Sequence, residues 1–259
     1  MKNDGKIKRL RTSKRDSAST SSMNKRESDF VTATSHQFRT PLSTIQTSLD
    51  LLEFYIGNGN ESRQIEILRK LKKSVGYLTD TVEKITSLYL YRSAKLKPKI
   101  RKVDLRNFVN DLLEEIVINI GDSHYINVGI EAGLDTIECD EFILKQILLN
   151  LLNNAIKYSP GGGQIRLDIK KEKKKLKFSV KDEGVGISKG DLDKLFHPFF
   201  RGRNAVSIPG IGLGLAIVKN LAKIHKASLG CFSRINQGSE FVIIIPAEYK
   251  NEKNPDYRR

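Results

Sequence analysis

The side chains best placed for chemistry lie in the octapeptide Ser35-His36-Gln37-Phe38-Arg39-Thr40-Pro41-Leu42. In a helix that advances about 100° per residue, His36 lies roughly 160° from Phe38, and Thr40 follows His36 one turn later. Pro41 has no N–H and tends to kink a helix. We expect the imidazole to face solvent and a stripe within about 40° of Phe38 to be buried, formed by Leu42, Ile45, Leu49, Leu52 and Ile56.

Further along the chain, the segment from Asn150 to Ser159 combines amides with a cation and an aromatic ring. Asn150 and Asn154 are four residues apart and share a helix face. Their neutral, hard amide oxygens suit Mg²⁺, which takes few protein ligands. Lys157 can reach a phosphate and Tyr158 can stack on a base. The alternative is a set of surface amides.

A second segment, Asp182-Glu183-Gly184-Val185-Gly186, follows a predicted strand. Glycine permits close approach and positive φ. The Asp182 carboxylate can accept a hydrogen bond from an exocyclic amine such as that of adenine. The alternative is an ordinary turn.

Two more segments complete the set. Leu195–Arg201 is an aromatic cluster followed by Gly202-Arg203-Asn204, which is either a corner of the core or the anchor of a mobile loop whose arginines meet phosphates. Gly210-Ile211-Gly212-Leu213-Gly214-Leu215 opens a helix whose free N–H groups favour an anion. The spacing fits neither a dinucleotide fingerprint nor a P-loop.

The elements that must position these residues form two groups. Helices are predicted over about Ser28–Ile56 and Glu61–Ala94, joined by the turn 57–60. We expect this hairpin to pair with a second copy as a four-helix dimer, since a lone hairpin leaves long apolar stripes uncovered. The alternative is that the stripe packs on the second domain of its own chain.

The second group of elements is predicted to form an α+β domain. Asp104 and Asp140 are predicted to cap helices that run to about Asn119 and Tyr158, and a third helix covers Leu213–Lys226. Alternating patterns predict strands over Tyr125–Ile130, Thr136–Cys139, Gln164–Lys171, Leu176–Asp182, Ser228–Arg234 and Ser239–Pro246. We expect a mixed sheet covered on one face by helices.

Composition narrows the function classes. The formal net charge is +15, carried largely by the N-terminal tail and by Lys170–Lys177. No aromatic residues interleave these lysines, which favours solvated charge over nucleic-acid binding. We find no apolar run of about 18 residues and no signal peptide, so a cytoplasmic protein without a transmembrane segment is expected. Cys139 and Cys231 lack metal-ligand spacing and are typical of ordinary thiols.

In their order and spacing, these segments closely resemble the H, N, G1, F and G2 boxes of bacterial two-component sensor histidine kinases over about residues 28–248. The resemblance implies an all-α helical hairpin that pairs as a four-helix-bundle dimer. A mixed-sheet α/β sandwich of the gyrase, histidine kinase and chaperone ATPase superfamily would follow it. The expected domains are a basic disordered tail, the dimerisation and phosphotransfer hairpin, a linker, the ATP-binding domain and a C-terminal tail, over residues 1–27, 28–95, 96–102, 103–248 and 249–259.

The resemblance also assigns roles. His36 would be the phosphoacceptor, and Thr40 would position water when the phosphorylated partner is hydrolysed. Asn154, supported by Asn150, would hold Mg²⁺, and Lys157 would touch phosphate. The remaining residues would bind ATP: Tyr158 beside the base, Asp182 on the adenine amine, Gly184 and Gly186 in that wall, Arg201 at the start of the lid, and Gly210, Gly212, Gly214 and Leu215 where the lid closes on the phosphates.

Gln37 departs from the family pattern, which most often has an acidic residue after the phosphoacceptor. Its amide oxygen can accept the Nδ1–H of the neighbouring imidazole, but it cannot take a proton at neutral pH. General-base help is worth about 10²- to 10⁴-fold, so part of that range is in question. Phosphoryl transfer itself depends mainly on positioning and charge neutralisation.

The resulting hypothesis is a kinase that phosphorylates His36 from Mg·ATP and passes the phosphoryl group to an aspartate of a separate response regulator. Two alternatives stay open: a dimeric ATP-binding module that mainly dephosphorylates or sequesters a regulator, and an ATPase without phosphohistidine. Three other histidines are weaker acceptors: His124 in a loop, His197 in the aromatic cluster, and His225 at a helix end that suits a cation.

Overall fold

The computed structural model describes residues 31–32, 34–35, 37–92, 97–117, 123–205, 208 and 210–249. The chain divides into two compact units, Met1–Val82 and Glu83–Arg259, and each is described by itself. The predicted tail over 1–27, the C-terminal residues 250–259 and His36, the predicted phosphoacceptor, lie outside the described residues.

The predicted helical hairpin makes up the described part of the first unit, and its second helix continues into the second unit. One helix extends over residues 37–57, and α2 follows over Glu61–Arg92. Between them, the N–H groups of Gly59 and Asn60 donate to Ile56 O and Tyr55 O at 3.3 and 3.2 Å. Gly59 has a φ of 66°, a left-handed conformation that glycine adopts without strain. The Asn60 side chain accepts from Arg63 N at 3.2 Å and caps α2, so the turn chemistry fixes where the second helix begins.

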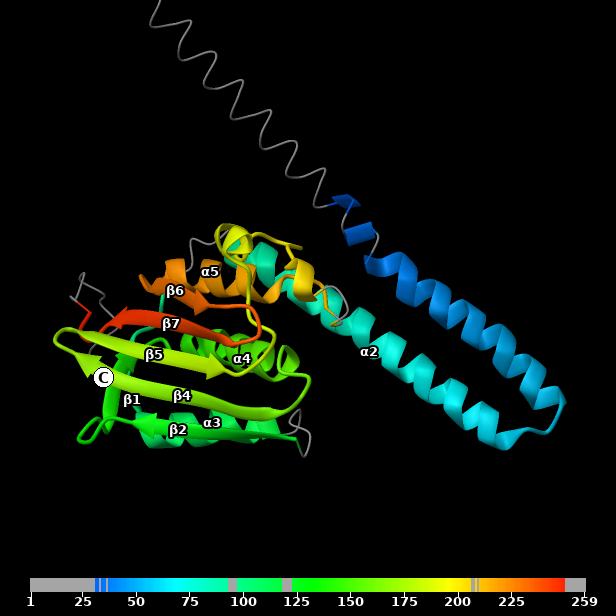
Figure 1. Ribbon diagram of the computed structural model, residues 1–259, viewed down its shortest axis with the longest axis horizontal. Helices are drawn as coiled ribbons and strands as arrows, with labels where there is room; N and C mark the ends of the chain where they lie inside the picture. The colour runs from blue at the N-terminus through cyan, green and yellow to red at the C-terminus, as the bar shows by residue number, and fades with distance from the viewer. Residues whose placement is uncertain are drawn as a thin grey trace, which may run out of the picture. The chain divides into compact units, whose positions relative to one another are not determined.

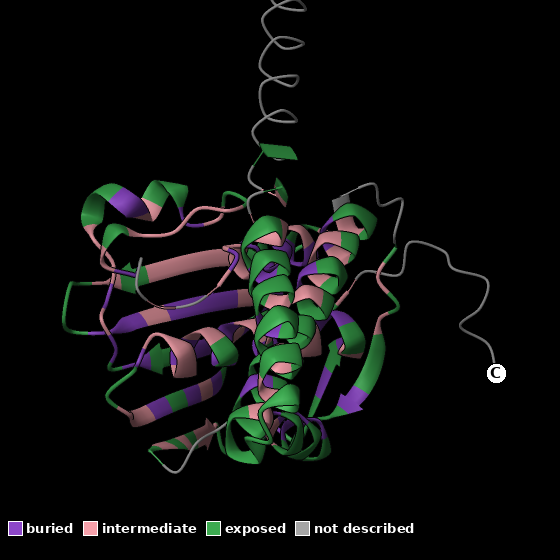
Figure 2. Cartoon of the chain, turned by 90° about the vertical axis from the view of Figure 1, so that its right-hand side faces the viewer, coloured by how far each residue is buried: buried purple, intermediate pink, exposed green. Residues whose placement is uncertain are grey.

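The stripe predicted to be buried is largely exposed in the single chain. Leu42, Leu49 and Ile56 are 53%, 48% and 61% exposed, whereas Pro41 and Ser48 are buried. Both hairpin helices are mostly in the exposed colour in Figure 2. A second helix covers only one side of its neighbour, so burial of the rest of the stripe still depends on the predicted second copy.

The second unit alternates strands and helices in the predicted order. Its elements are β1 (Arg101–Asp104), α3 (Leu105–Val117), β2 (His124–Ile130), β3 (Thr136–Cys139), α4 (Glu141–Lys157), β4 (Gly163–Glu172), β5 (Lys175–Asp182), the 3₁₀ turns η1 (Lys189–Lys194) and η2 (Arg203–Ala205), α5 (Gly214–Ile224), β6 (Ser228–Ser233) and β7 (Ser239–Pro246). We assigned residues 101–102 to a linker, but they begin β1, which pairs antiparallel with β3 from Arg101↔Cys139 to Asp104↔Thr136.

The main sheet has the strand order β2-β4-β5-β7-β6. β2 and β4 are parallel, and every other neighbouring pair is antiparallel. Figure 1 shows α3, α4 and α5 gathered on one face of this sheet. The prediction of a mixed sheet with helices on one face is confirmed.

The core of this unit lies between α4 and the strands β4 and β5. Leu144, Ile147, Leu148 and Leu152 of α4 are fully buried, and so are Ile165, Leu167 and Ile169 on alternate positions of β4. Burying each such side chain contributes roughly 1.5–3 kcal/mol relative to leaving it exposed. This packing sets the rotation of α4 about its own axis, and therefore the direction in which its polar residues point.

Among the residues that the structure describes, no helix combines the length and apolar character needed to cross a membrane.

Candidate nucleotide site

Two of the asparagines of α4, Asn150 and Asn154, face the start of α5. The helix begins at the Asp140 cap, whose side chain accepts from Ile143 N at 3.0 Å. Asn150 Nδ2 donates to Gln146 O at 2.8 Å, which fixes the orientation of its amide. A Cβ placed on Gly214 would lie 3.1 Å from Asn150 Oδ1 and 3.8 Å from Asn154 Oδ1. Both amide groups therefore lie beside the point where the glycine-rich loop enters α5, with the oxygen of Asn150 the nearest atom.

Lys157 approaches the same loop from the end of α4. A Cβ on Gly210 would overlap the Lys157 ammonium, and Gly210 has a φ of 146°. Lys157 Nζ also lies 5.0 Å from the centroid of the Tyr158 ring. Burial, with the Arg201 guanidinium nearby, lowers the pKa of Lys157 to about 8. The cation is thus held against a loop whose bare N–H groups favour an anion.

Asp182 ends β5 and is only 3% exposed. Its Oδ1 accepts from Gly184 N at 2.9 Å and from Ser239 N at 3.1 Å. Burial raises the pKa of the Asp182 carboxyl, and these two N–H donors oppose that rise. Because both bonds are made to one oxygen, the carboxylate can offer its other oxygen to an amine donor.

The glycines that follow Asp182 let the chain pass very close to neighbouring backbone. A Cβ on Gly184 would overlap Tyr158 O, and a Cβ on Gly186, whose φ is 65°, would overlap Arg234 O. Val185 N donates to Tyr158 O at 3.0 Å, which joins this loop to the end of α4. The close approach explains why glycine occupies both positions.

A cavity opens between this loop, α4 and the segment after the aromatic cluster. Five residues that were given a role from the sequence line it: Asn154, Tyr158, Gly186, Arg201 and Leu215. Further lining residues were missed, among them Ile187, Ser239 and Phe241, because only the fold shows which side chains of these strands and turns face the cavity. Asn204 also lines the cavity; it was named with the segment after the aromatic cluster but was given no role of its own.

The aromatic cluster contacts the glycine-rich loop, and Arg201 braces the segment between them. Phe199 N donates to Gly212 O at 2.9 Å. Arg201 Nη2 donates to Ala205 O at 2.6 Å and also to Ile208 O. The arginine expected at the start of the lid is therefore used, in this structure, to hold the backbone of the lid segment.

The other expected site residues belong to the hairpin unit. Gln37 is half-buried and accepts from Tyr77 Oη at 2.8 Å, and Thr40 is exposed on the helix over 37–57. Their relation to the nucleotide residues is not fixed, because they belong to the separate unit. The roles of these residues and of His36 stay predictions.

The remaining histidines differ from their sequence-based descriptions. His124 begins β2 rather than lying in a loop, and His197 is exposed. His225 is fully buried; its Nε2 accepts from Asp140 N at 3.0 Å, and Tyr249 Oη lies 2.5 Å from its Nδ1. Burial lowers the pKa of His225, so the expectation of a cation at this helix end was wrong.

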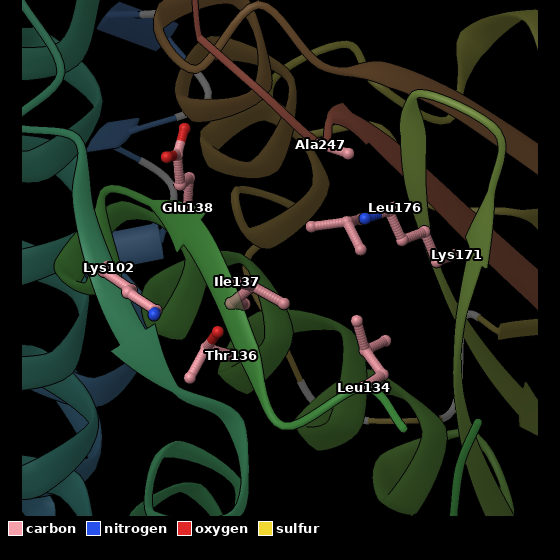
Figure 3. Close-up of a pocket in the computed structure, with 8 residues that line it drawn as sticks. All are labelled: Lys102, Leu134, Thr136, Ile137, Glu138, Lys171, Leu176 and Ala247. Atoms are coloured by element: carbon pink, nitrogen blue, oxygen red, sulfur yellow. The ribbon is translucent and has the colours of Figure 1, made fainter. Parts of the chain in front are cut away.

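A second pocket lies near the opposite end of β5 (Figure 3). Its lining comes from the β1–β3 ribbon, the ends of β4 and β5 and the chain after β7: Lys102, Leu134, Thr136, Ile137, Glu138, Lys171, Leu176 and Ala247. Leu176 and Asp182 are separated by six residues of extended strand, about 20 Å. None of the residues predicted to bind nucleotide lines this pocket, so the first cavity is the candidate nucleotide site.

Among the described residues, no group of three or more His, Cys, Asp or Glu side chains could hold a metal ion. The candidate metal ligands are instead the amides of Asn150 and Asn154. Two neutral oxygens beside a glycine-rich loop fit Mg²⁺, which usually keeps several waters and also binds substrate phosphates.

Comparison with known proteins agrees with this geometry. Residues 26–92 match the His Kinase A (phospho-acceptor) domain, and residues 139–249 match the histidine kinase-, DNA gyrase B- and HSP90-like ATPase. The chain therefore carries the two domains of the catalytic core of a two-component sensor histidine kinase.

Individual relatives extend the comparison. The chain is 29% identical over 238 residues to the sensor-like histidine kinase SenX3 of Mycobacterium tuberculosis strain H37Rv, which covers 89% of this chain and 57% of SenX3. It spans about half the length of the curated relatives it matches. Full-length ShkA in complex with AMPPNP aligns with a TM-score of 0.61 and 25% identity, over 82% of this chain and 44% of ShkA.

One solved structure shows a relative of this fold with its partner. Histidine kinase ThkA in complex with response regulator protein TrrA aligns with a TM-score of 0.66 over 86% of this chain and 61% of that chain. The identity is 18%, so this likeness concerns the fold alone.

Proposed function

We propose that this chain is a histidine kinase that transfers the γ-phosphoryl group of Mg·ATP to His36. The group then passes to an aspartate on a separate response regulator. Because ATP and response regulators are cytoplasmic, we propose that the reaction takes place there. The alternatives are a module that mainly dephosphorylates a regulator and an ATPase without phosphohistidine.

The observation that carries this proposal is the convergence of α4 on the glycine-rich loop. Asn150 and Asn154 face Gly214, and Lys157 lies against Gly210, so amides and an ammonium meet free helical N–H groups at one place. Such an arrangement suits a polyphosphate and its metal ion. Asp182 is buried next to the cavity-lining Ser239, from whose N–H it accepts, and would accept from the adenine amine.

The protein groups have distinct parts in this chemistry. A Mg²⁺ ion bound to the Asn150 and Asn154 amides would neutralise charge on the phosphates. Lys157 would bind phosphate oxygen as a cation, and ATP would raise its lowered pKa by offering opposite charge. Tyr158 lines the cavity and would contact the base. Little covalent work is left to the protein, since phosphoryl transfer depends mainly on positioning and electrostatics.

The hairpin is proposed to serve as acceptor and dimer interface. On the helix over 37–57, exposed apolar residues recur every seven positions at Leu42, Leu49 and Ile56. On α2, a matching exposed series has the same spacing at Leu68, Val75, Val82 and Tyr89. Seven-residue spacing is the pattern of helices that pack in a bundle, and it supports a homodimer. Thr40 is exposed and is proposed to position water during hydrolysis of the phosphorylated regulator.

The test is labelling with γ-³²P-ATP and Mg²⁺. Phosphohistidine is stable in base and lost in acid, so we expect a base-stable label on the wild type and none on His36→Gln. His197→Gln is the matched control, because His197 is exposed in the second unit and should keep the label.

Equal labelling of wild type and His36→Gln would overturn the kinase proposal. Tight ATP binding by an unlabelled wild type would favour the regulator-dephosphorylating module. ATP hydrolysis that does not depend on His36, without label, would favour the simple ATPase.

A further inference from the structure

The segment after the aromatic cluster contacts the base-side wall of the nucleotide cavity through one side chain. Asn204 Nδ2 donates to Val185 O at 3.1 Å and to Gly186 O at 2.6 Å. Asn204 belongs to η2, whereas Val185 and Gly186 belong to the loop after β5. Both amide hydrogens of Asn204 are therefore used to join two segments that are about twenty residues apart in the chain.

The loop that Asn204 contacts is held on its other side by the β6–β7 turn. Gly184 O accepts from Gly238 N at 3.0 Å, and Val185 O accepts from Asn236 N at 2.9 Å. Ile187 N donates to Ser233 Oγ at 2.8 Å. These bonds attach one side of the loop after β5 to the sheet. Asn204 attaches the other side of the same loop to η2.

The segment around Asn204 is itself anchored. Arg203 N donates to Oδ2 of the buried Asp191 at 3.4 Å. Arg201 braces the carbonyls of Ala205 and Ile208. The backbone is thus hydrogen-bonded on both sides of Asn204. Ordering its side chain therefore costs less conformational entropy, and its two hydrogen bonds can set the position of the loop.

We propose that Asn204 is a positioning residue for the base of ATP: by joining the start of the lid to the Val185–Gly186 carbonyls, it pre-forms the adenine wall beside Asp182. Asn204, Val185 and Gly186 all line the cavity. A wall formed in advance does not have to be ordered when the nucleotide binds, which favours affinity. This inference rests on the proposed ATP site and adds a residue that neither the motif spacing nor the amide ligands identify.

The phosphate side of the cavity is attached differently. Gly210, Gly212 and Gly214 lie against Lys157, the aromatic cluster and the α4 amides. The hydrogen bonds that the Asn204 amide donates go instead to the loop after β5. Removing the Asn204 donors should therefore weaken binding of the base more than binding of the phosphates.

The test compares equilibrium binding of Mg·ATP, adenosine and Mg·tripolyphosphate by calorimetry in the full chain. Asn204→Asp keeps the shape but replaces both donors by an acceptor that faces two carbonyls. We expect the Kd of adenosine and of ATP to rise about ten-fold or more, the scale of one to two hydrogen bonds, with tripolyphosphate changed less than two-fold. Asn127→Asp, which adds the same charge at an exposed position on β2, is the matched control and should leave all three affinities unchanged.

A second variant guards against misfolding. Asn204→Ala removes the donors without adding charge and should show the same order of effects, with a smaller rise for adenosine. Asn204→Ser retains one donor and should restore part of the affinity for adenosine. If only Asn204→Asp fails to fold, the Kd values of Asn204→Ala and Asn204→Ser for adenosine and tripolyphosphate test the inference.

Two outcomes would overturn the inference. One is an unchanged adenosine affinity in both Asn204→Asp and Asn204→Ala. The other is an equal loss for adenosine and tripolyphosphate, which would mean that the whole cavity had collapsed. A wild type that binds no adenine nucleotide would refute the proposed function together with this inference, whereas the loss of phosphohistidine alone would leave the binding test of Asn204 intact.

Discussion

Tyr77 of α2 donates from its hydroxyl to Gln37 Oε1 at 2.8 Å, across the helical hairpin and next to the proposed phosphoacceptor in the sequence. Thr81, one turn further along α2 and fully buried, donates from Oγ1 to Tyr77 O at 2.7 Å. One lone pair of the Gln37 amide oxygen is thereby engaged, and Tyr77 on the other helix of the same hairpin fixes the orientation of the amide. The residue that departs from the family pattern is thus matched by a specific neighbour.

This hydrogen bond predicts a measurable change once Gln37 is made acidic. In Gln37→Glu, the Tyr77 hydroxyl should donate to the new carboxylate and lower its pKa, since hydrogen bonds to a charged form favour that form. The rate of His36 labelling should then fall on the acid side as the introduced carboxylate becomes protonated. Adding Tyr77→Phe should move that acid limb upward by about half to one pH unit.

The control is Tyr77→Phe in the natural Gln37 background, compared with the wild type. Tyr77→Phe alone should change the labelling rate without creating a new acid limb, because an amide does not titrate in this range. An identical acid limb in Gln37→Glu with and without Tyr77 would contradict the pairing. A large loss of labelling in Gln37→Glu would show that the amide has a role of its own.

The α4 asparagines predict a metal-dependent affinity. Asn154→Ala should lose most of the Mg²⁺-dependent part of ATP binding, which is measured as the ratio of Kd values with Mg²⁺ and with EDTA. Asn153→Ala is the matched control, because Asn153 is the adjacent asparagine but is exposed. An unchanged ratio in Asn154→Ala would remove our metal assignment, and an equal loss in Asn153→Ala would point to helix destabilisation instead.

The lowered pKa of Lys157, about 8, predicts a pH dependence of ATP binding. Phosphate favours the protonated amine, so ATP affinity should be flat below pH 8 and weaken above it, by at most about ten-fold per pH unit. Binding at pH 8.5 should take up a proton, which calorimetry in buffers of different ionisation enthalpy detects. In the free protein the same shift adds stability as pH rises from 8 toward 10.5, because the unfolded chain then holds the proton more tightly.

Two substitutions separate Lys157 from other groups that titrate. Lys157→Arg stays charged and should show no weakening of ATP binding between pH 8 and 9. Lys157→Met should bind ATP weakly at every pH. If the wild type and Lys157→Arg weaken in parallel, the titrating group is elsewhere.

Much of the second unit was predictable because its patterns are local. The caps at Asp104 and Asp140 are confirmed, with Asp104 Oδ1 accepting from Asn107 N at 2.9 Å. β3 and β7 have the predicted bounds. Periodicity and capping depend on residues a few positions apart, and a single sequence contains them.

What the sequence could not show depends on distant partners. β1 is four residues long and is stabilised by pairing with β3, some 35 positions away, so no local alternation marks it. His225 looks like a helix-end cation, but Asp140 N–H reaches its Nε2 from another helix and requires a lone pair there. Asn204 likewise bonds to carbonyls of a loop that its own segment does not reveal.

Replacing Gly184 by alanine should destabilise the protein, and Gly190 provides a matched control. Gly184→Ala would place a Cβ into Tyr158 O, and this neighbour is backbone, which leaves little room to relax. Overpacking of this kind costs about 1–3 kcal/mol of unfolding free energy, which urea denaturation followed by circular dichroism measures. Gly190→Ala, where a Cβ meets nothing within 4 Å, should change stability by about 0.5 kcal/mol or less. Equal effects at the two positions would contradict the close approach.

The exposed heptad series predicts which surface of the hairpin holds a dimer together. Leu49 and Leu51 are 48% and 45% exposed in the single chain, yet they lie about 200° apart around the helix, and only Leu49 belongs to the series. Leu49→Lys places a charge in the proposed interface, where burying it unpaired is costly. We expect sedimentation equilibrium to show at least a roughly ten-fold weaker dimer for Leu49→Lys and an unchanged one for Leu51→Lys. Because the two variants carry the same charge change at nearly equal exposure, equal dimer dissociation in both would place the interface on another face.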